Sequence, residues 1–262
     1  MLVYWLEQEQ KDLPNDDAWL CSDENERFEK LRFQKRRADW KLGRWTAKCA
    51  VAFRFGWPSQ SPVLREIEIR ATESGAPQAF APGLQKPVTI SISHSSGRAI
   101  CAISASDIEL GCDLEWIEPR SQAFIADYFT RDEQARIERA CDVERSKLVT
   151  LLWSAKESAL KAMHEGLRLD PRCLHVSLCQ GSPDVSGWSP LQVHFLDRHI
   201  FPGCWSGDDS LVRTVVADPF SGYPVRLPRA DARSGYGDAG TSAPAAKRGA
   251  CSSDPQFPYV AA

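Results

Sequence analysis

The sequence lacks any long hydrophobic run and any large excess of charge of one sign. No segment approaches the roughly 18 uncharged apolar residues that a membrane-spanning helix needs, and the first residues lack the basic segment of a secretion signal. We therefore expect a cytoplasmic protein. The formal net charge is −3 over 262 residues, which predicts no general attraction to nucleic acid or to an anionic membrane. A binding site for a polyanion would have to be a local cluster.

Several motifs are missing as well. The nine cysteines are odd in number and include no CxxC pair, so the pattern favours buried thiols over a disulfide framework or a zinc site. The chain has no GxxxxGK[ST] and no GxGxxG segment, which excludes the common nucleotide-binding loops. Ser93 and His94 are adjacent, but no GxSxG turn accompanies them, so a serine hydrolase is not indicated.

The first half of the chain contains the pattern of a basic helix followed by a small sheet. Apolar residues recur at helical spacing between positions 36 and 55, and the other face of that segment is basic. Strict alternation of apolar and polar residues predicts a strand at 88–94, and two further strands at 99–103 and 108–115 complete an antiparallel meander. Asp113 and Glu115 share one face of the last strand. The basic face of the helix comprises Arg37, Lys41, Arg44 and Lys48.

The second half of the chain opens with helices. Thr130 and Glu133 match a capping box, and a helix with a continuous apolar stripe is predicted at 146–164. Glu157 and Lys161 project together from adjacent turns of that helix. Gly166 suits the position that ends it.

Strand-like runs then repeat the order of the first half, helices followed by a short antiparallel sheet, although no residue-level repeat is visible. We predict an α+β fold of two pseudo-symmetric lobes, each a small antiparallel sheet packed with helices. Beyond Pro224 few apolar residues remain, which predicts a disordered tail. The runs lie at 174–179, 191–196 and 211–217, and the expected parts are residues 1–110, 111–224 and 225–262.

Two constellations could carry chemistry. Asp113, Glu115 and Glu157 would offer hard oxygen ligands to Mg²⁺ if the fold brought them together, leaving positions for phosphate and water. On spacing alone they could equally be solvated acids, with Glu157 an exposed partner of Lys161. His94 and its neighbouring serines could receive a phosphate, or His94 could be a half-buried structural residue. The basic helix face could hold a phosphate or simply face solvent.

Four segments in order make these signals specific. Their order resembles the 4'-phosphopantetheinyl transferases, specifically the longer, surfactin-synthetase-activating type, over about residues 20 to 220. The pairing of G-x-D-x-E with W-S-x-K-E-x-x-x-K is the most specific part. The segments are RRADWKLGR at 36–44, SISH at 91–94, GCDLE at 111–115 and WSAKESALKA at 153–162.

The resemblance implies an enzyme of the holo-[acyl-carrier-protein] synthase type. Such a protein would be a monomer of two pseudo-symmetric lobes with coenzyme A between them and Mg²⁺ on its pyrophosphate. It would transfer 4'-phosphopantetheine to a serine of an apo acyl, peptidyl or aryl carrier protein and release 3',5'-ADP. By the same resemblance Asp113, Glu115 and Glu157 are the metal ligands, and Glu157 and Lys161 are catalytic. Residues matched to coenzyme A contacts are Arg36, Arg44, Ser93, His94, Asp113, Lys156 and Lys161.

The chain departs from the family pattern at one turn. Relatives commonly have Gly-Lys-Pro before the strand leading to the histidine, whereas this chain has Gly75-Ala76-Pro77. The lysine contact to coenzyme A is therefore missing, and Arg70 or a basic residue of the helix could replace it. Two other functions stay open: a carrier or coenzyme A binding module without catalysis, and a Mg²⁺-dependent phosphohydrolase that needs no carrier.

Overall fold

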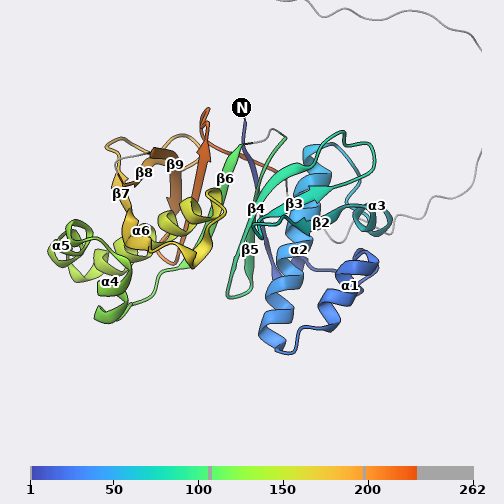
Figure 1. Cartoon of the computed structure of the whole chain (residues 1–262), viewed down its shortest axis with the longest axis horizontal. Helices are drawn as coiled ribbons and strands as arrows, with labels where there is room; N and C mark the ends of the chain where they lie inside the picture. The colour runs from blue at the N-terminus through green and yellow to red at the C-terminus, as the bar shows by residue number, and fades with distance from the viewer. Residues whose placement is uncertain (1, 106–107, 197–198, 229–262) are drawn as a thin grey trace, which may run out of the picture. The chain divides into compact units, whose positions relative to one another are not determined.

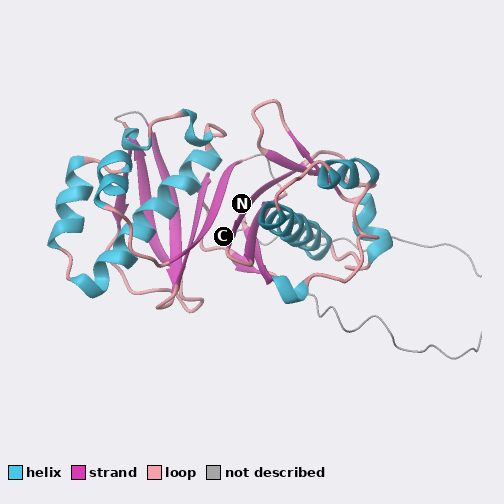
Figure 2. Ribbon diagram, turned by 90° about the horizontal axis from the view of Figure 1, so that it is seen from below, coloured by secondary structure: helices cyan, strands magenta, loops and turns pink. Residues whose placement is uncertain are grey.

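The computed structural model describes residues 2–105, 108–196 and 199–228, and it contains two sheets that each pack against a long helix (Figure 1). Figure 2 shows the same sheets and their helices from a second side. The predicted α+β class is confirmed. No helix in these described ranges is long and apolar enough to cross a membrane.

The N-terminal lobe is a six-stranded sheet with α2 packed on it. Strand order is β11-β1-β5-β4-β3-β2, and all pairings are antiparallel except the parallel pair of β1 and β11. Its helices are α1 (Ser22–Glu29), α2 (Gln34–Arg54) and α3 (Ser61–Glu66), preceded by a 3-10 turn at Gln10–Asp12. Its strands are β1 (Tyr4–Glu9), β2 (Glu68–Ala71), β3 (Pro77–Phe80), β4 (Val88–Ser95), β5 (Arg98–Ser104) and β11 (Val225–Arg226).

The C-terminal lobe is a five-stranded antiparallel sheet with α6 packed on it. Strand order is β6-β10-β9-β8-β7. Its helices are α4 (Gln122–Tyr128), α5 (Arg131–Arg139) and α6 (Asp142–Ala162), followed by 3-10 turns at Gly166–Arg168 and Pro171–Cys173. Its strands are β6 (Glu109–Trp116), β7 (Leu174–Leu178), β8 (Ser189–Phe195), β9 (His199–Gly207) and β10 (Leu211–Asp218).

The predicted meander of three strands is wrong in one respect, because β6 leaves the first sheet. It pairs with β10, with Asp113 opposite Thr214. It lies beside β4 of the first sheet without pairing with it. The backbone N–H of Cys112 donates to Ser91 Oγ at 2.9 Å, which holds β6 beside β4. The strand itself was predicted correctly, but alternation of residues cannot distinguish between two sheets as partners.

The end of α6 also differs from the prediction. The helix stops at Ala162, and the residue in the left-handed conformation is His164, with φ of 58°, although Gly166 is also left-handed. The backbone N–H of His164 donates to the carbonyl of Lys161, and that of Glu165 donates to the carbonyl of Leu160. These two bonds form a Schellman motif that turns the chain sharply after Lys161.

The segment expected to be a disordered tail begins inside the fold. Val225 and Arg226 pair with Tyr4 and Trp5 of β1, and Leu227 is buried in the first core. Backbone pairing to a strand already in place can order such a short segment despite its polar surroundings. Residues 229–262 of the expected tail lie outside the described residues.

A buried lysine anchors the long helix of each lobe in the same way. Lys48 of α2 forms an ion pair with Glu24 and donates to the carbonyls of Trp19 and Leu64. Burial lowers the pKa of Lys48, and the charge of Glu24 opposes that shift. Glu24 also accepts from the backbone N–H of Ile69, so one carboxylate ties helix, loop and strand together.

The second lobe repeats this arrangement residue for residue. Lys156 of α6 forms an ion pair with Glu133 at 2.7 Å and donates to the carbonyls of Tyr128 and Pro171. Glu133 accepts from the backbone N–H of Val176. Each glutamate is also the third residue of a capping box. The internal repeat that the sequence does not display is therefore present in the contacts.

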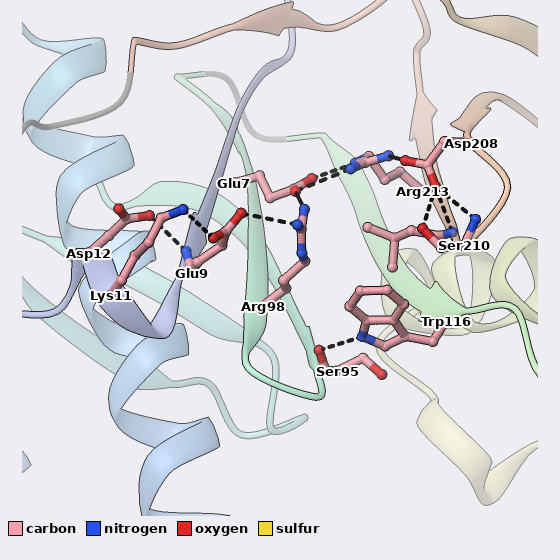
Figure 3. A network of polar contacts seen from close by, with 11 residues as sticks. Glu7, Glu9, Lys11, Asp12, Ser95, Arg98, Trp116, Asp208, Ser210 and Arg213 are labelled. Atoms are coloured by element: carbon pink, nitrogen blue, oxygen red, sulfur yellow. Dashed lines mark hydrogen bonds and ion pairs between the residues drawn. The ribbon is translucent and has the colours of Figure 1, made fainter.

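A second ionic network joins the two lobes (Figure 3). Glu7 of β1 is 1% exposed and lies between Arg98 of β5 and Arg213 of β10, forming ion pairs with both. On β6, Trp116 Nε1 donates to the carbonyl of Ser95 at 3.2 Å. Because these contacts hold β1, β5 and the end of β4 against β6 and β10, they fix how the two sheets meet.

Candidate active site

Asp113 lies at the centre of a polar group where the two lobes meet. Its side chain is 4% exposed, and Oδ1 accepts hydrogen bonds from Ser93 Oγ at 2.7 Å and from Lys161 Nζ at 2.8 Å. The other oxygen, Oδ2, is buried and has no hydrogen-bond partner among the described residues. A buried carboxylate oxygen without a donor is unfavourable, so this atom is a natural ligand for a cation.

Lys161 reaches this group from the last turn of α6. Its ammonium donates to the carbonyl of Cys112 at 3.0 Å as well as to Asp113. Burial acts to lower the pKa of Lys161, but the attraction of Asp113 and Glu157 together raises it above the ordinary value. The side chain stays 27% exposed, so a charged lysine is available beside Asp113.

Glu115 and Glu157 complete the predicted trio. Burial, and then repulsion from Asp113, raises the pKa of Glu115 to about 7, while Arg120 opposes the shift. Burial also raises the pKa of Glu157, against the attraction of Lys161. Repulsion from Asp113 raises the pKa of both glutamates, and Glu157 also raises that of Glu115, which indicates an acidic site with too little positive charge.

The carboxylates of Asp113, Glu115 and Glu157 do not lie close enough together in this structure to form a metal-ligand group. Within the part of the chain that is described, the only three potential ligands that lie within 4.8 Å of one another are Glu109, His199 and Asp218. In that group His199 Nε2 lies 2.9 Å from Asp218 Oδ2, so a direct polar contact already joins two of its members. Asp113, by contrast, uses one oxygen for Lys161 and Ser93 and leaves the other open.

Helix α6 packs closely on β6 because Gly111 of that strand has no side chain. A Cβ on Gly111 would lie 1.7 Å from the carbonyl oxygen of Ser158, so only glycine lets the helix approach this closely. Buried hydroxyls add to the fit, since Ser154 and Ser158 both contact Thr214 Oγ1 of β10, at 2.9 and 2.7 Å. These contacts set the position of Glu157 and Lys161 relative to Asp113.

His94 ends β4 on the other side of this group. It packs against α2, where a Cβ on Gly43 would lie 3.6 Å from His94 Cδ2. Surrounding protein atoms lower the pKa of His94 by disfavouring the charged ring, while Asp39 acts in the opposite direction. The imidazole is accessible to solvent, so it can offer a neutral ring nitrogen to a ligand.

The structure does not bring every predicted residue to this group. Lys156 is fully buried in its pair with Glu133 and faces away from Asp113. Arg44 donates to the carbonyl of Ile69 at 3.0 Å and lies over the Trp40 ring.

The basic face of α2 is therefore neither solvated nor open to phosphate along its length. Arg37 donates to the carbonyls of Phe28 and Leu31, and Lys41 forms an ion pair with Asp17. With Arg44 and Lys48 also committed, these four cations hold α1, β2 and the loops against the helix. Arg36 stands apart as an exposed residue on the first turns of α2.

A pocket of about 230 Å³ adjoins Lys161. Its lining comes from both lobes: Ile90 and Ile92 of β4, Leu110 of β6 and Leu160 of α6 are apolar, and the turn at 74–77 and Arg168 also line it. A larger hollow of about 900 Å³ lies over α5, α6 and β7, and it shares no lining residue with this pocket.

Three residues near the site were not singled out from the sequence. Arg120 lies 3.6 Å from Glu115 Oε2, Trp116 bonds the backbone of β4, and Arg168 lines the pocket. The first two stand on or after β6, where proximity to Glu115 could have suggested them. Arg168 acts across the two lobes, and no local periodicity reports such a contact.

Comparison with known proteins places this geometry in a family. Residues 109–215 match the model of the 4'-phosphopantetheinyl transferase superfamily. Over 85 residues the chain is 34% identical to a holo-[acyl-carrier-protein] synthase of Anoxybacillus flavithermus, covering 32% of this chain and 70% of that protein. The chain belongs to the 4'-phosphopantetheinyl transferase superfamily. Over 164 residues it is also 24% identical to the 4'-phosphopantetheinyl transferase HetI of a Nostoc species, covering 62% of this chain and 67% of that protein.

The matched region of this superfamily member contains most of the polar group. It includes β6 with Asp113 and Glu115, and α6 with Glu157 and Lys161. Ser93 and His94 lie before it, on the N-terminal lobe. Membership in the superfamily therefore agrees with the resemblance seen in the sequence, and the assignment to its longer type stays a prediction.

Proposed function

We propose that this protein transfers the 4'-phosphopantetheine group of coenzyme A to a serine of an apo carrier protein and releases 3',5'-ADP. The observation that carries the proposal is the buried, unpartnered Oδ2 of Asp113 beside the charged Lys161, in a chain of the phosphopantetheinyl transferase superfamily. A carboxylate that needs a cation and a lysine that can meet a phosphate suit phosphoryl chemistry.

The donor set fits Mg²⁺. Asp113 Oδ2 would be one ligand, and Glu115 and Glu157 would supply two more oxygens, the hard ligands that Mg²⁺ takes together with phosphate and water. Burial, and then repulsion from Asp113, raise the pKa of both glutamates, and a bound cation would favour their charged forms. When bound, Mg²⁺ would neutralise charge on the pyrophosphate.

Glu157 is proposed as the general base. Burial raises the pKa of Glu157 toward neutral pH, which makes its carboxylate a stronger proton acceptor than an exposed one. The serine oxygen forms a bond to the phosphorus that bears the pantetheine arm, the bond from that phosphorus to the bridging pyrophosphate oxygen breaks, and the serine proton passes to Glu157 directly or through water. The leaving 3',5'-ADP takes the electron pair of the broken bond.

Lys161 and the strand-end residues are proposed to hold the phosphates. The charged ammonium of Lys161 would stabilise the negative charge that builds on the leaving group. Ser93 supports Asp113 by donating to Oδ1, and His94 would donate to a phosphate as a neutral imidazole. Arg36 is free to meet the coenzyme from α2, whereas the contacts of Lys156 and Arg44 give them structural roles.

A transfer assay tests the proposal. The full chain is incubated with coenzyme A, Mg²⁺ and each of several apo acyl, peptidyl and aryl carrier proteins, and the intact mass of each carrier is measured. We expect at least one carrier to gain a single phosphopantetheine group. Unmodified carriers across the whole panel would contradict the proposal.

The same assay separates the two other functions. Release of 3',5'-ADP without any carrier would indicate a phosphohydrolase. Binding of coenzyme A without transfer would indicate a binding module. The proposed enzyme needs the carrier for release of 3',5'-ADP, because the carrier serine is the nucleophile.

A further inference from the structure

Arg168 is a cation at the pocket beside Lys161 that the proposed chemistry does not use. It ends the 3-10 turn after α6 and belongs to the pocket lining together with Lys161 and His164. The pocket measures about 230 Å³, below the roughly 300 Å³ at which sites for whole small molecules begin. It can therefore hold one end of a ligand as large as coenzyme A.

The guanidinium of Arg168 is fixed in place by backbone carbonyls. Its Nη2 donates to the carbonyl of His164 at 2.6 Å and to that of Ser74 at 3.4 Å, and its Nε donates to the carbonyl of Glu165 at 3.1 Å. Two of these acceptors belong to the turn that the Schellman motif creates, and Ser74 belongs to the opposite lobe. Arg168 therefore spans the pocket from the C-terminal lobe to the 74–77 turn.

Its remaining donors are available to a ligand. In the described part of the chain Nη1 makes no hydrogen bond, and the carboxylate of Glu165, at 3.7 Å from Nε, is the charged group facing Arg168. Lys161, the other cation of the lining, already donates to Asp113 and to the carbonyl of Cys112. A second phosphate near this pocket would thus be met by Arg168.

The charges on coenzyme A identify that phosphate. Its pantetheine arm is uncharged and offers no anion for a cation to bind, whereas its nucleotide end bears a 3'-phosphate in addition to the pyrophosphate. A phosphate monoester has a second pKa near 6 and is close to doubly charged at neutral pH. Nη1 of Arg168 keeps its N–H donors for such a group, and a guanidinium that carbonyls hold in place presents them in a fixed direction.

We infer that Arg168, which contacts the 74–77 turn, binds the 3'-phosphate of coenzyme A in this pocket. This inference rests on the proposed function. Arg168 of the C-terminal lobe would then supply the positive charge that the 74–77 turn lacks, because position 76 is alanine. The apolar walls from Ile90, Ile92 and Leu160 take the adenine ring, and Arg168 closes the edge beside them.

The test measures binding and not turnover. Isothermal titration compares coenzyme A with dephospho-coenzyme A, which lacks the 3'-phosphate, for the wild-type full chain and for Arg168→Gln. Wild type prefers coenzyme A. Arg168→Gln weakens coenzyme A binding about tenfold, as expected for the loss of a charged hydrogen-bond donor, and leaves dephospho-coenzyme A binding unchanged.

Arg172→Gln is the matched control, because Arg172 is an exposed arginine on the next 3-10 turn whose guanidinium pairs with Asp170 and does not line the pocket. It should bind both ligands as wild type does. Adding Ala76→Lys to Arg168→Gln should restore at least half of the lost preference, since both side chains line the same pocket.

Each other outcome has a definite meaning. Equal weakening of both ligands by Arg168→Gln, an unchanged preference, or no recovery with Ala76→Lys would overturn the role of Arg168. Wild-type protein that binds neither ligand would overturn the proposed function itself. The two failures are therefore distinguishable in one set of titrations.

Discussion

The two lobes share a scaffold but differ in what the long helix carries. Lys48 in α2 and Lys156 in α6 make the same set of contacts, each with a capping-box glutamate and two loop carbonyls. The next residue is Cys49 in the first lobe and Glu157 in the second. Cys49 is fully buried among apolar side chains. The scaffold is therefore present in both lobes, but only the second has an acidic residue directly after the buried lysine.

The largest expected effect concerns the residue that breaks the symmetry. Glu157→Gln should reduce transfer to a carrier protein by about 10²–10⁴-fold, the usual contribution of a general base. Circular dichroism and the melting temperature should stay close to those of wild type, since Glu157 is partly exposed. Glu138→Gln, an exposed position on α5, is the control. A loss of less than tenfold would remove Glu157 from the role of base.

The next comparison sets one glycine of each lobe against the other. Gly111→Ala places a Cβ against the backbone of α6, 1.7 Å from Ser158 O, so α6 must shift. We expect at least about 3 kcal/mol of destabilisation and about a 10²-fold loss of transfer, because a displacement near 1 Å can cost that much. Both are measured by urea unfolding and by carrier mass.

Gly43→Ala is the matched variant in the first lobe. There the new Cβ would meet only side-chain atoms, Ile92 Cγ2 at 3.3 Å and His94 Cδ2 at 3.6 Å. The helix gains up to about 1 kcal/mol from replacing glycine, which offsets the tight contact. Equal stability losses for Gly43→Ala and Gly111→Ala would show that the close approach of α6 to β6 has no special role.

The buried lysines offer a direct test of the shared scaffold. Lys48→Met and Lys156→Met should each lower the free energy of unfolding by about 3–5 kcal/mol, because either change leaves a buried glutamate without its partner. Lys35→Met, exposed on α2, should change it by less than about 0.5 kcal/mol. Urea denaturation followed by tryptophan fluorescence measures all three.

Activity then separates structure from catalysis in the same variants. Per folded molecule, Lys156→Met should transfer as well as Lys48→Met, because neither ammonium reaches Asp113. If Lys156→Met lost transfer activity that Lys48→Met kept at the same folded fraction, Lys156 would have a role at the coenzyme site, as the family resemblance suggested.

The smallest effect concerns the junction of the lobes. Trp116→Phe removes the hydrogen bond from Nε1 to the carbonyl of Ser95 but keeps an aromatic ring beside Arg98. We expect about 1 kcal/mol of lost stability. Trp40→Phe on α2 removes an indole N–H that makes no hydrogen bond in the described structure, and it should cost less than Trp116→Phe.

Sequence patterns predicted the elements better than their partners. Periodicity located β4, β5, β6, α2 and α6, and the capping box at Thr130 and Glu133 is present as predicted. The strand β9 was not predicted, because its run HIFPGCWSG is interrupted by proline and glycine. Pairing of β6 with β10 instead of β5 is a long-range contact, which local alternation cannot report.

For the site, the sequence identified the acidic residues, but it did not show which groups the lysine and arginine side chains contact. Asp113 and Lys161 form an ion pair, and both of them act on the pKa of Glu115 and of Glu157. Helical spacing placed Lys48 on an outward basic face, whereas the structure buries it. A lysine whose ammonium reaches an acid on another element can be buried, and the sequence does not reveal that acid. Arg168 was not predicted because its contact with Ser74 joins segments that are far apart in the sequence.

The most direct test of the central claim is whether a divalent cation binds at Asp113. Mn²⁺, as a spectroscopic substitute for Mg²⁺, is titrated into the full chain with coenzyme A and followed by electron paramagnetic resonance. We predict that Asp113→Asn weakens binding at least about tenfold, while Asp218→Asn, in the Glu109, His199 and Asp218 group, leaves it unchanged. Unchanged binding in Asp113→Asn, with loss in Asp218→Asn, would contradict the account.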